Sequence, residues 1–463
     1  MNRQSAAPAA EGSGGDPVQA AVDALPLNRR HFIVFALCAA GLFFEALNLQ
    51  LMSFVAPMLA SEWHIGPTML GGLISATIAG MLVGTYAFGA VADRFGRRGA
   101  FQITVGIFSI LTAVSGLAGT LGQLMVARFG AGLGIGGSIP VETAVLAEFT
   151  PARWRSRFMA IWAMALPVGA LVAPLCVAVM PLSLGWRGLL LLGGIPAVLV
   201  LIVRGAIPET PQYLAGKGRL AEAEQALAWI ARRPMPLAPS LPAPDGAARR
   251  DSGQAPEILL FTAAYRRTTL VSWGIYFGSF FAYYGFVLWM PAFLAGYRGM
   301  ATAGILRFMV GLALAGLVGR IAIVLVAGRI DRRILIAACS LGGAASLLCL
   351  AAQTAAVAIA ASAFAAAFFL EGAFSAVIPF VAESYPTALR ATGVGWSGGM
   401  GRFGTVLAPI IFGALVRIDA GYAMGALAVG ALLAVASVAF ARPAAVAANA
   451  AIQPPRNQVK HAR

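Results

Sequence analysis

The sequence predicts an all-α polytopic membrane protein with twelve transmembrane helices in two six-helix, pseudo-symmetric halves. Of its 463 residues, 59% are hydrophobic and only 11% are charged, whereas a soluble globular domain has about 25% charged residues. Apolar runs of about 20 residues, the length that an α-helix needs to cross a bilayer, recur between short polar breaks. Because these runs do not alternate in polarity and backbone amides in lipid must be satisfied internally, helices are expected rather than barrel strands.

The expected organisation follows from the order of the apolar runs. The twelve runs lie near 32–58, 69–91, 100–120, 123–146, 158–181, 187–206, 268–295, 303–327, 333–352, 355–380, 391–416 and 421–441. The expected parts are a flexible cytoplasmic segment over 1–28, a first half over 29–206, a central loop over 207–266, a second half over 267–441 and a tail over 442–463. Segment 1–28 lacks the pattern of a signal peptide, so the first long run should remain as a membrane helix. In the central loop, Leu220, Ala223, Leu227 and Ile230 are spaced as on one face of an amphipathic helix.

The basic residues indicate the orientation in the membrane. The formal net charge is +15, but the arginines lie in short clusters between apolar runs, so no nucleic-acid partner is expected. The loops on one side hold Arg29, Arg30, Arg94, Arg97, Arg98, Arg153, Arg155, Arg157, Arg329, Arg332, Arg333, Arg390 and Arg442. The opposite loops hold only Arg187, Arg298, Arg307 and Arg417. The positive-inside rule therefore predicts a multi-pass protein of the inner (cytoplasmic) membrane, with both termini and the central loop in the cytoplasm.

An internal repeat relates the two halves. The segment 147–151, Ala-Glu-Phe-Thr-Pro, reappears 235 residues later as Ala-Glu-Ser-Tyr-Pro at 382–386. The pair Asp93-Arg94 likewise has a counterpart in Asp331-Arg332, each in the loop after the second helix of its half. Parallel repeats of this kind place a substrate site near the bilayer midplane, between the halves.

A motif between the second and third runs supports this organisation. The stretch 89–98 contains Gly89, Asp93, Arg94, Arg97 and Arg98, and it resembles the cytoplasmic signature of the major facilitator superfamily. Asp331 and Arg332 belong to a weaker copy in the second half. The resemblance implies a latch, in which the aspartate contacts a helix N-terminus or a basic residue of the other half. The alternative is a merely solvated charged turn.

Two further stretches point to a branch of that superfamily. The glycine-rich segment 128–137, with Pro140, and the segment 385–393, with Gly401-Arg402-Phe403-Gly404, resemble the metabolite:proton symporters that include aromatic acid and niacin transporters. This resemblance covers roughly residues 30–441. The segment Pro208-Glu209-Thr210-Pro211 is similar to the sugar porters, but the seventh run lacks the paired glutamines with which those bind hydroxyl groups. A flatter, more apolar substrate than a sugar is therefore expected.

Charged residues deep in the membrane are candidates for the site, because an ionised side chain at mid-bilayer is costly unless it is paired or faces water. At 1.5 Å per residue, Glu45 and Glu371 lie about 20 Å into their helices and Arg402 about 17 Å. Arg320 is similarly deep, Arg128 enters only about 9 Å from the outer face, and Glu142 is expected at the inner interface. We expect the arginines to bind a substrate carboxylate and Glu45 and Glu371 to carry protons. The alternative for each is a buried Arg–Glu pair that only holds two helices together.

The candidate site has two other features. The resemblance implies functional roles for Arg402 and Arg128, and aspartates at the positions that Glu45 and Asn48 occupy, so proton coupling through a pair on this helix is in question. Asn48 is instead a candidate substrate ligand. Aromatic residues of the seventh run could line the pocket, although packing or lipid contact is the alternative. These residues are Phe280, Tyr283, Tyr284 and Trp289.

The sequence thus predicts a proton-coupled, alternating-access transporter of a small organic anion, namely an aromatic or heterocyclic monocarboxylate. The alternatives are a proton-driven exporter of drugs or metabolites and, less favoured, a sugar porter. An enzyme is not expected, because no clustered nucleophile is present. The four cysteines and three histidines have no metal-ligand spacing, so neither metal nor cofactor is expected. The expected partners are the substrate, protons and the lipid bilayer, and the expected state is a monomer.

Overall fold

The computed structural model describes residues 17–179, 184–237 and 256–441, and the regular structure in these ranges is helical. Eleven of the described helical segments are long and apolar enough to cross a membrane. The first half contains α2 (Arg29–Glu62), α3 (Pro67–Phe95), α4 (Arg97–Ser115), α5 (Leu121–Phe149), α6 (Ala152–Ala163), α7 (Ala165–Val179), α8 (Gly185–Leu192) and α9 (Ala197–Ala206). The second half contains α13 (Arg266–Arg298), α14 (Thr302–Val326), α15 (Arg332–Ala352), α16 (Ala356–Glu383), α17 (Thr387–Leu415) and α18 (Ala420–Ala439). The predicted all-α membrane fold is confirmed.

Two predicted spans are divided in the structure. The fifth, expected over 158–181, forms α6 and α7, which meet at Met164. The sixth run, expected as a single helix over 187–206, forms the two short helices α8 and α9. They are joined by a tight turn in which the Gly194 amide donates to the Leu191 carbonyl at 2.9 Å. Pro196 lacks an amide hydrogen and therefore cannot continue the hydrogen-bond pattern of a helix from α8. The sixth predicted span is therefore present as two short helices rather than one.

The two halves repeat the same helix contacts. In the first half, α5 packs against α3 and α4, and α2 packs against α7. In the second half, α16 packs against α14 and α15 in the same way, and α13 packs against α17. The contacts between the halves are also paired, because α3 packs on α17 and α7 packs on α14. This correspondence is what the sequence repeat predicts for two related six-helix units.

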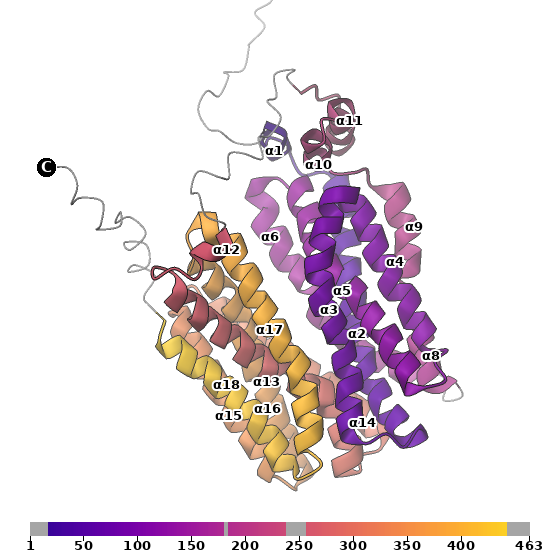
Figure 1. Ribbon diagram of the computed structural model, residues 1–463, viewed down its shortest axis with the longest axis vertical. Helices are drawn as coiled ribbons and strands as arrows, with labels where there is room; N and C mark the ends of the chain where they lie inside the picture. Colours follow the sequence, from indigo (N-terminus) through magenta and orange to yellow (C-terminus); the bar gives the residue numbers. More distant parts are fainter. Residues whose placement is uncertain (1–16, 180–183, 238–255, 442–463) are drawn as a thin grey trace, which may run out of the picture.

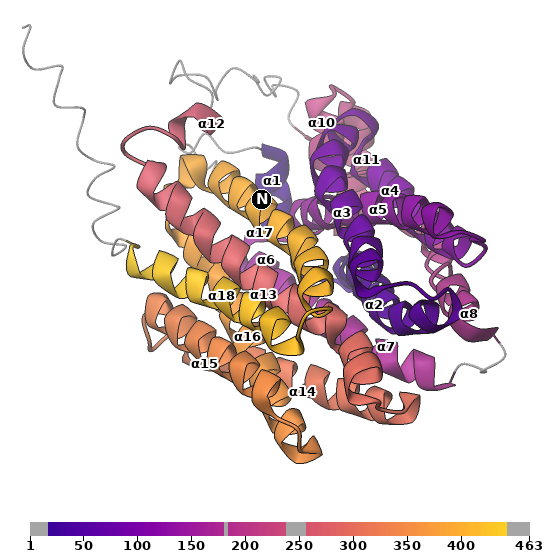
Figure 2. The same cartoon turned by 60° about the horizontal axis from the view of Figure 1, so that its bottom comes forward.

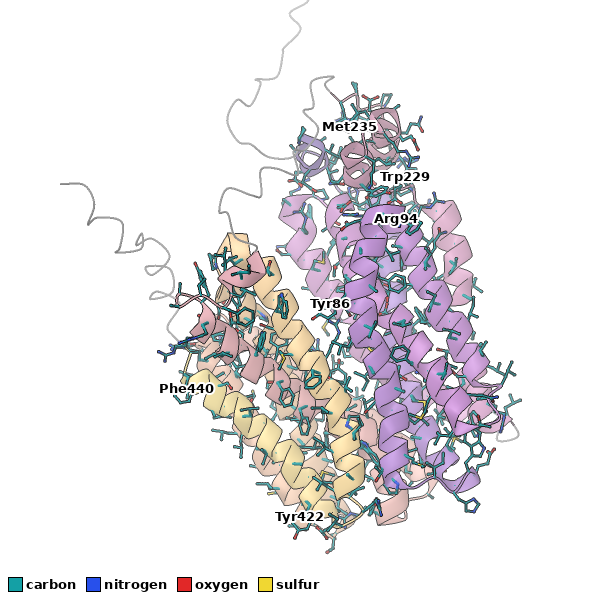
Figure 3. All side chains as sticks on the ribbon, in the orientation of Figure 1. Tyr86, Arg94, Trp229, Met235, Tyr422 and Phe440 are labelled. Atoms are coloured by element: carbon teal, nitrogen blue, oxygen red, sulfur yellow. The ribbon has the colours of Figure 1, made fainter. Side chains whose placement is uncertain are left out.

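Short helices outside the membrane segments gather at one end of the molecule, which we call the basic end. Here α1 (Pro17–Asp23), α10 (Pro211–Gly216) and α11 (Leu220–Ala231) lie together over the first half (Figure 1). Figure 3 places Arg94 at this end and Tyr422 at the other, which we call the opposite end. A further short helix, α12 (Pro256–Leu259), precedes α13.

The N-terminal segment differs in part from the expected flexible lead. Within 1–28, Val18 and Val22 of α1 are buried against Leu227 of α11, so this part of the segment is helical and packed. Residues 1–16, residues 238–255 of the central loop and the expected tail 442–463 lie outside the described residues.

The halves meet closely at the opposite end and are apart at the basic end. A Cβ atom on Gly71 of α3 would clash with the Pro409 backbone of α17, and one on Gly413 would clash with the Pro67 backbone. At the basic end, Gly89 of α3 and Gly395 of α17 have no neighbouring atom in that position. The same divergence of the purple and yellow halves toward the end with α10 and α11 is visible in Figure 1, and Figure 2 turns the opposite end toward the viewer.

Candidate functional site

Two small cavities lie between the halves, midway along the helices. One is lined by Glu45 of α2 together with Tyr283 and Tyr284 of α13, and its volume is about 60 Å³. The other is lined by Glu371 of α16 and has a volume of about 40 Å³. Tyr283 and Gln50 border both cavities. The two carboxylates that the sequence placed at the midplane thus face the same central region from opposite halves, and Gln50 is a lining residue that sequence reasoning missed.

Glu45 is buried and accepts a hydrogen bond from the Ser138 hydroxyl of α5. The carboxyl of Glu142, one turn further along α5, lies beside it. Glu142 is fully buried between helices, and it lies two turns before the end of α5 at Phe149. The spacing of Ser138 and Glu142, four residues apart on one helix face, could have signalled a polar stripe directed at α2.

Arg128 and Asn48 form a polar cluster inside the first half. Both terminal nitrogens of Arg128 donate to the Asn48 amide oxygen at 3.1 Å, and its Nε donates to the Thr77 hydroxyl at 3.1 Å. The Asn48 amide nitrogen donates to Thr112 at 2.7 Å. Gly193, in the turn between α8 and α9, gives this cluster room, because a Cβ there would meet Thr112 and Asn48. The Arg128 guanidinium is fully buried and is held by neutral oxygens.

Arg320 and Glu371 form a buried ion pair in the second half. Arg320 donates to one Glu371 oxygen through Nε at 2.9 Å and through Nη2 at 2.5 Å, and the two side chains are 11% and 4% exposed. The Phe374 ring lies 5.7 Å from the Arg320 guanidinium carbon. The other Glu371 oxygen has no hydrogen-bond partner. This ion pair joins α14 to α16. It therefore matches the alternative interpretation, in which a buried Arg–Glu pair holds two helices together.

Arg402 of α17 is placed differently from the other two arginines. It lies within electrostatic range of Tyr276, Tyr284 and Tyr86, and of Glu45 in the first half. Tyr86 projects from α3 toward the second half (Figure 3). Among the residues that the structure describes, no carboxylate is within ion-pair distance of Arg402. It is therefore a half-buried cation between the halves whose charge is available to a ligand.

The aromatic residues separate into two groups. Phe280, Tyr283 and Tyr284 gather around Phe374 of α16, with ring centroids 4.7, 5.3 and 6.2 Å from that ring. Phe374 is a member that sequence reasoning missed. Trp289 is not part of this group, because it is 1% exposed, packs on Phe412 and donates to the Pro409 carbonyl at 3.1 Å. The structure thus makes Trp289 a packing residue toward the opposite end.

The predicted latch residues of the first half bond to their own half and to the central loop. Asp93 is 75% exposed and pairs with Arg97 at 2.9 Å. Arg97 also pairs with Glu148 at 3.2 Å. The backbone amides of Arg97 and Arg98 donate to Glu209 at 2.9 and 3.0 Å, and the Arg94 carbonyl accepts from Tyr213. Glu209 thus ties this loop to the start of α10, a role that sequence reasoning missed.

The second-half copy of the motif behaves in the same way. Arg332 pairs with Glu383 at 3.0 Å and Arg333 pairs with Asp331 at 2.8 Å. The hydrogen bonds from Arg333 hold the pKa of the Asp331 carboxyl below its usual range. In this conformation Asp93 and Asp331 therefore each bond to arginines of their own half, and Gly89 faces open space.

The family was identified by comparison with known proteins. Residues 42–447 match the family described as "Sugar (and other) transporter". The chain belongs to this family. The transporter therefore lies in the major facilitator superfamily, as its signature predicted, and it is not an enzyme.

Relatives of the transporter are similar along most of their length. The niacin transporter of Acinetobacter baylyi is 30% identical over 393 residues, 84% of this chain and 88% of the relative. The 4-hydroxybenzoate transporter of Pseudomonas aeruginosa is 31% identical over 432 residues, 91% and 94% of the two chains. The inward-open xylose transporter from E. coli has the same fold, with a TM-score of 0.67 at 15% identity over 89% of this chain and 95% of that one. The resemblance to aromatic acid and niacin transporters is confirmed.

Proposed function

We propose that this transporter moves an aromatic or heterocyclic monocarboxylate together with a proton. The observation that carries the proposal is Arg402, a cation without a carboxylate partner among the described residues, beside Tyr276 and Tyr284 and within electrostatic range of Glu45. A guanidinium offers a planar fork to a carboxylate, and tyrosine rings stack on a flat substrate. Niacin and 4-hydroxybenzoate, the substrates after which two relatives are named, are acids of this shape.

Arg402 also provides a physical link between substrate and proton. When a substrate carboxylate occupies Arg402, the arginine no longer compensates a negative charge on Glu45, and Glu45 holds its proton. When the substrate leaves, Arg402 again stabilises ionised Glu45, and the proton is released. Substrate binding at Arg402 thus favours protonation of Glu45, and protonation of Glu45 favours substrate binding. The transporter then changes between its inward-facing and outward-facing conformations either empty or with both substrate and proton bound. This is the requirement for symport.

Substrate access requires the halves to move. The two central cavities, of about 60 and 40 Å³, lie between the halves, so movement of the halves changes the space available to an aromatic acid. The glycine contacts close the opposite end, and the basic end is open. We assign the basic end, with both termini, to the cytoplasm of the inner membrane and expect the transporter to act as a monomer.

The test compares acids with their carboxamides. Benzoate- or nicotinate-like acids should raise the thermal unfolding temperature of the purified transporter and compete for uptake. Their carboxamides, which lack the charge that Arg402 binds, should bind at least about tenfold more weakly, a loss of about 1.4 kcal/mol. Equal binding of acid and amide, or selective binding of glucose or xylose, would refute the proposal.

The direction of transport is tested in energised vesicles. An inward proton gradient should accumulate the acid inside right-side-out vesicles. Extrusion of the acid under the same gradient would instead identify a proton-driven exporter.

A further inference from the structure

A second carboxyl group, Glu142, lies next to Glu45 in the interior of the first half. Glu45 lines the central cavity, whereas Glu142 lies behind it, between α5 and α2. Gly41, one turn before Glu45, makes room for Glu142, since a Cβ at position 41 would overlap the Glu142 carboxyl. The site is thus shaped to hold a carboxyl group against α2.

The surroundings of this pair contain no close cation in the part of the chain that the structure describes. The groups facing the pair are Ser138 of α5, Cys38 of α2 and Trp162 of α6, with Arg402 of α17 as the charged residue in electrostatic range of Glu45. Both Glu142 oxygens and one Glu45 oxygen are buried without a hydrogen-bond donor. The Ser138 hydroxyl donates to Glu45, and the nearby Trp162 ring nitrogen donates to the Cys38 carbonyl at 3.1 Å.

These contacts are incompatible with two ionised carboxylates. Two adjacent negative charges in a low-dielectric interior repel each other strongly, so one of two neighbouring carboxyls keeps a proton. A proton on one carboxyl would also donate to a Glu oxygen that otherwise lacks a donor, which removes the cost of an unsatisfied buried group. The pair then titrates as a unit rather than as two separate residues.

We propose that Glu45 and Glu142 share the transported proton, with Glu142 as its position nearer the basic end. The transfer breaks the O–H bond of Glu45 and forms an O–H bond on Glu142, which leaves Glu45 as a carboxylate facing the cavity and Arg402. Glu142 follows Ser138 by four residues on a helix that runs toward the basic end, a displacement of about 6 Å. The inference rests on the proposed proton symport and names the residue that completes it.

The first test is Glu142→Gln, which keeps the size of the side chain and removes its titratable group. In liposomes, gradient-driven accumulation of the acid should fall at least about tenfold, while exchange of labelled for unlabelled substrate stays within about threefold of the wild type. The matched control is Thr143→Ala on the same helix, which should accumulate normally. Wild-type accumulation by Glu142→Gln would overturn the proposal, whereas failure of the wild type to accumulate any acid would overturn the proposed function.

The second test asks whether the carboxyls act as one unit. The double variant Glu45→Gln/Glu142→Gln should accumulate no less than either single variant, because removing either member already disables the pair. Losses that multiply would show two independent groups and contradict the sharing of one proton. If Glu142→Gln does not reach the membrane, Glu142→Asp and Glu142→Asn compare a carboxyl with an amide on side chains of equal length. Of these two variants, only Glu142→Asp should accumulate substrate.

A third measurement needs no substrate. The infrared spectrum of the purified wild type at neutral pH should contain a protonated-carboxyl band that is missing from the double variant. Identical spectra of the two proteins would overturn the shared proton, whatever the substrate of the transporter is.

Discussion

The amide oxygen of Asn48 accepts hydrogen bonds from both terminal nitrogens of Arg128. A neutral side chain thus occupies the place where the resemblance to aromatic acid transporters implies a carboxylate. Because Arg128 is fully buried, its charge is stabilised by oriented dipoles of Asn48 and Thr77 rather than by a counterion. This relationship leads to a prediction about the stability of the first half.

Replacing Asn48 by leucine should destabilise the first half. The Arg128 guanidinium would lose the amide oxygen that accepts from both its terminal nitrogens, at a fully buried position, and hydrogen bonds to charged groups contribute about 1.5–3 kcal/mol each. Asn48→Asp should be at least as stable as the wild type, because it keeps the acceptor and adds an opposite charge. Thermal unfolding of purified variants measures both effects, and an unchanged unfolding temperature for Asn48→Leu would contradict this account.

Arg402→Ala should abolish uptake of the acid while leaving normal amounts of monodisperse protein in the membrane. The amount of protein should stay normal because, among the described residues, no carboxylate forms an ion pair with Arg402. Its removal therefore leaves no buried carboxylate unpaired. Arg402→Lys should rescue poorly, since a point charge lacks the guanidinium fork. Radiolabelled uptake and gel-filtration profiles separate the two effects. Wild-type uptake by the alanine variant would exclude the role.

Glu45→Gln should uncouple transport from the proton gradient, because glutamine mimics the protonated side chain permanently. Exchange across the membrane should survive, and accumulation driven by a pH gradient should disappear. Both are measured in proteoliposomes with and without an imposed gradient. If accumulation persists, the proton travels through another group, and Glu371→Gln is the variant to measure next.

Breaking the ion pair between Arg320 and Glu371 should cost stability in a non-additive way. Removing one partner leaves a buried charge without compensation, which costs about 3–5 kcal/mol, whereas replacing both by apolar residues is often nearly neutral. Arg320→Met and Glu371→Leu should therefore each lower the unfolding temperature, and the double variant should recover most of the loss. Additive losses would show that the two charges do not depend on each other.

Gly413→Val should prevent closure of the opposite end. The added side chain would overlap the Pro67 backbone and lie 3.0 Å from the Trp289 ring. When the opposite end cannot close, the halves should approach each other at the basic end. In a cysteine-free background, the thiol introduced by Gly395→Cys at the basic end should therefore react more slowly with a maleimide. Gly425→Ala, where no atom is near, is the control. Unchanged labelling would show that the glycine contact does not control the orientation.

Much of the fold follows from hydropathy, because helix length and apolar composition are properties of single segments. The break between α8 and α9 was missed because Gly193 and Pro196 are tolerated in membrane helices when neighbouring groups satisfy the backbone. The room that Gly193 provides depends on Asn48 and Thr112, which are far away in the sequence. Such a requirement appears only when the helices are packed.

The sequence predicted how deep the site residues lie along their helices, but not which neighbouring helix each side chain faces. Counting residues placed Glu45 and Glu371 at the level of the two cavities, as the structure shows. Trp289 was grouped with the aromatic pocket by its residue type and its place on the seventh run, and neither specifies what a neighbouring helix covers. Glu142 is enclosed by α2, and Trp289 is enclosed by α17.

The close glycine contact between α3 and α17 has a mechanical consequence. The two helices touch backbone to backbone near Gly71, and Gly89 lies at the other end of α3, about 27 Å away at 1.5 Å per residue. With the contact as a fulcrum, each helix is a stiff lever arm, so a tilt of about 10° moves its far end by about 5 Å at this length. Side chains at the fulcrum would shift by only a fraction of that. A small sliding of the Pro409 and Pro67 carbonyls past Gly71 and Gly413 thus changes the opening between the halves at the basic end by about the width of an aromatic ring.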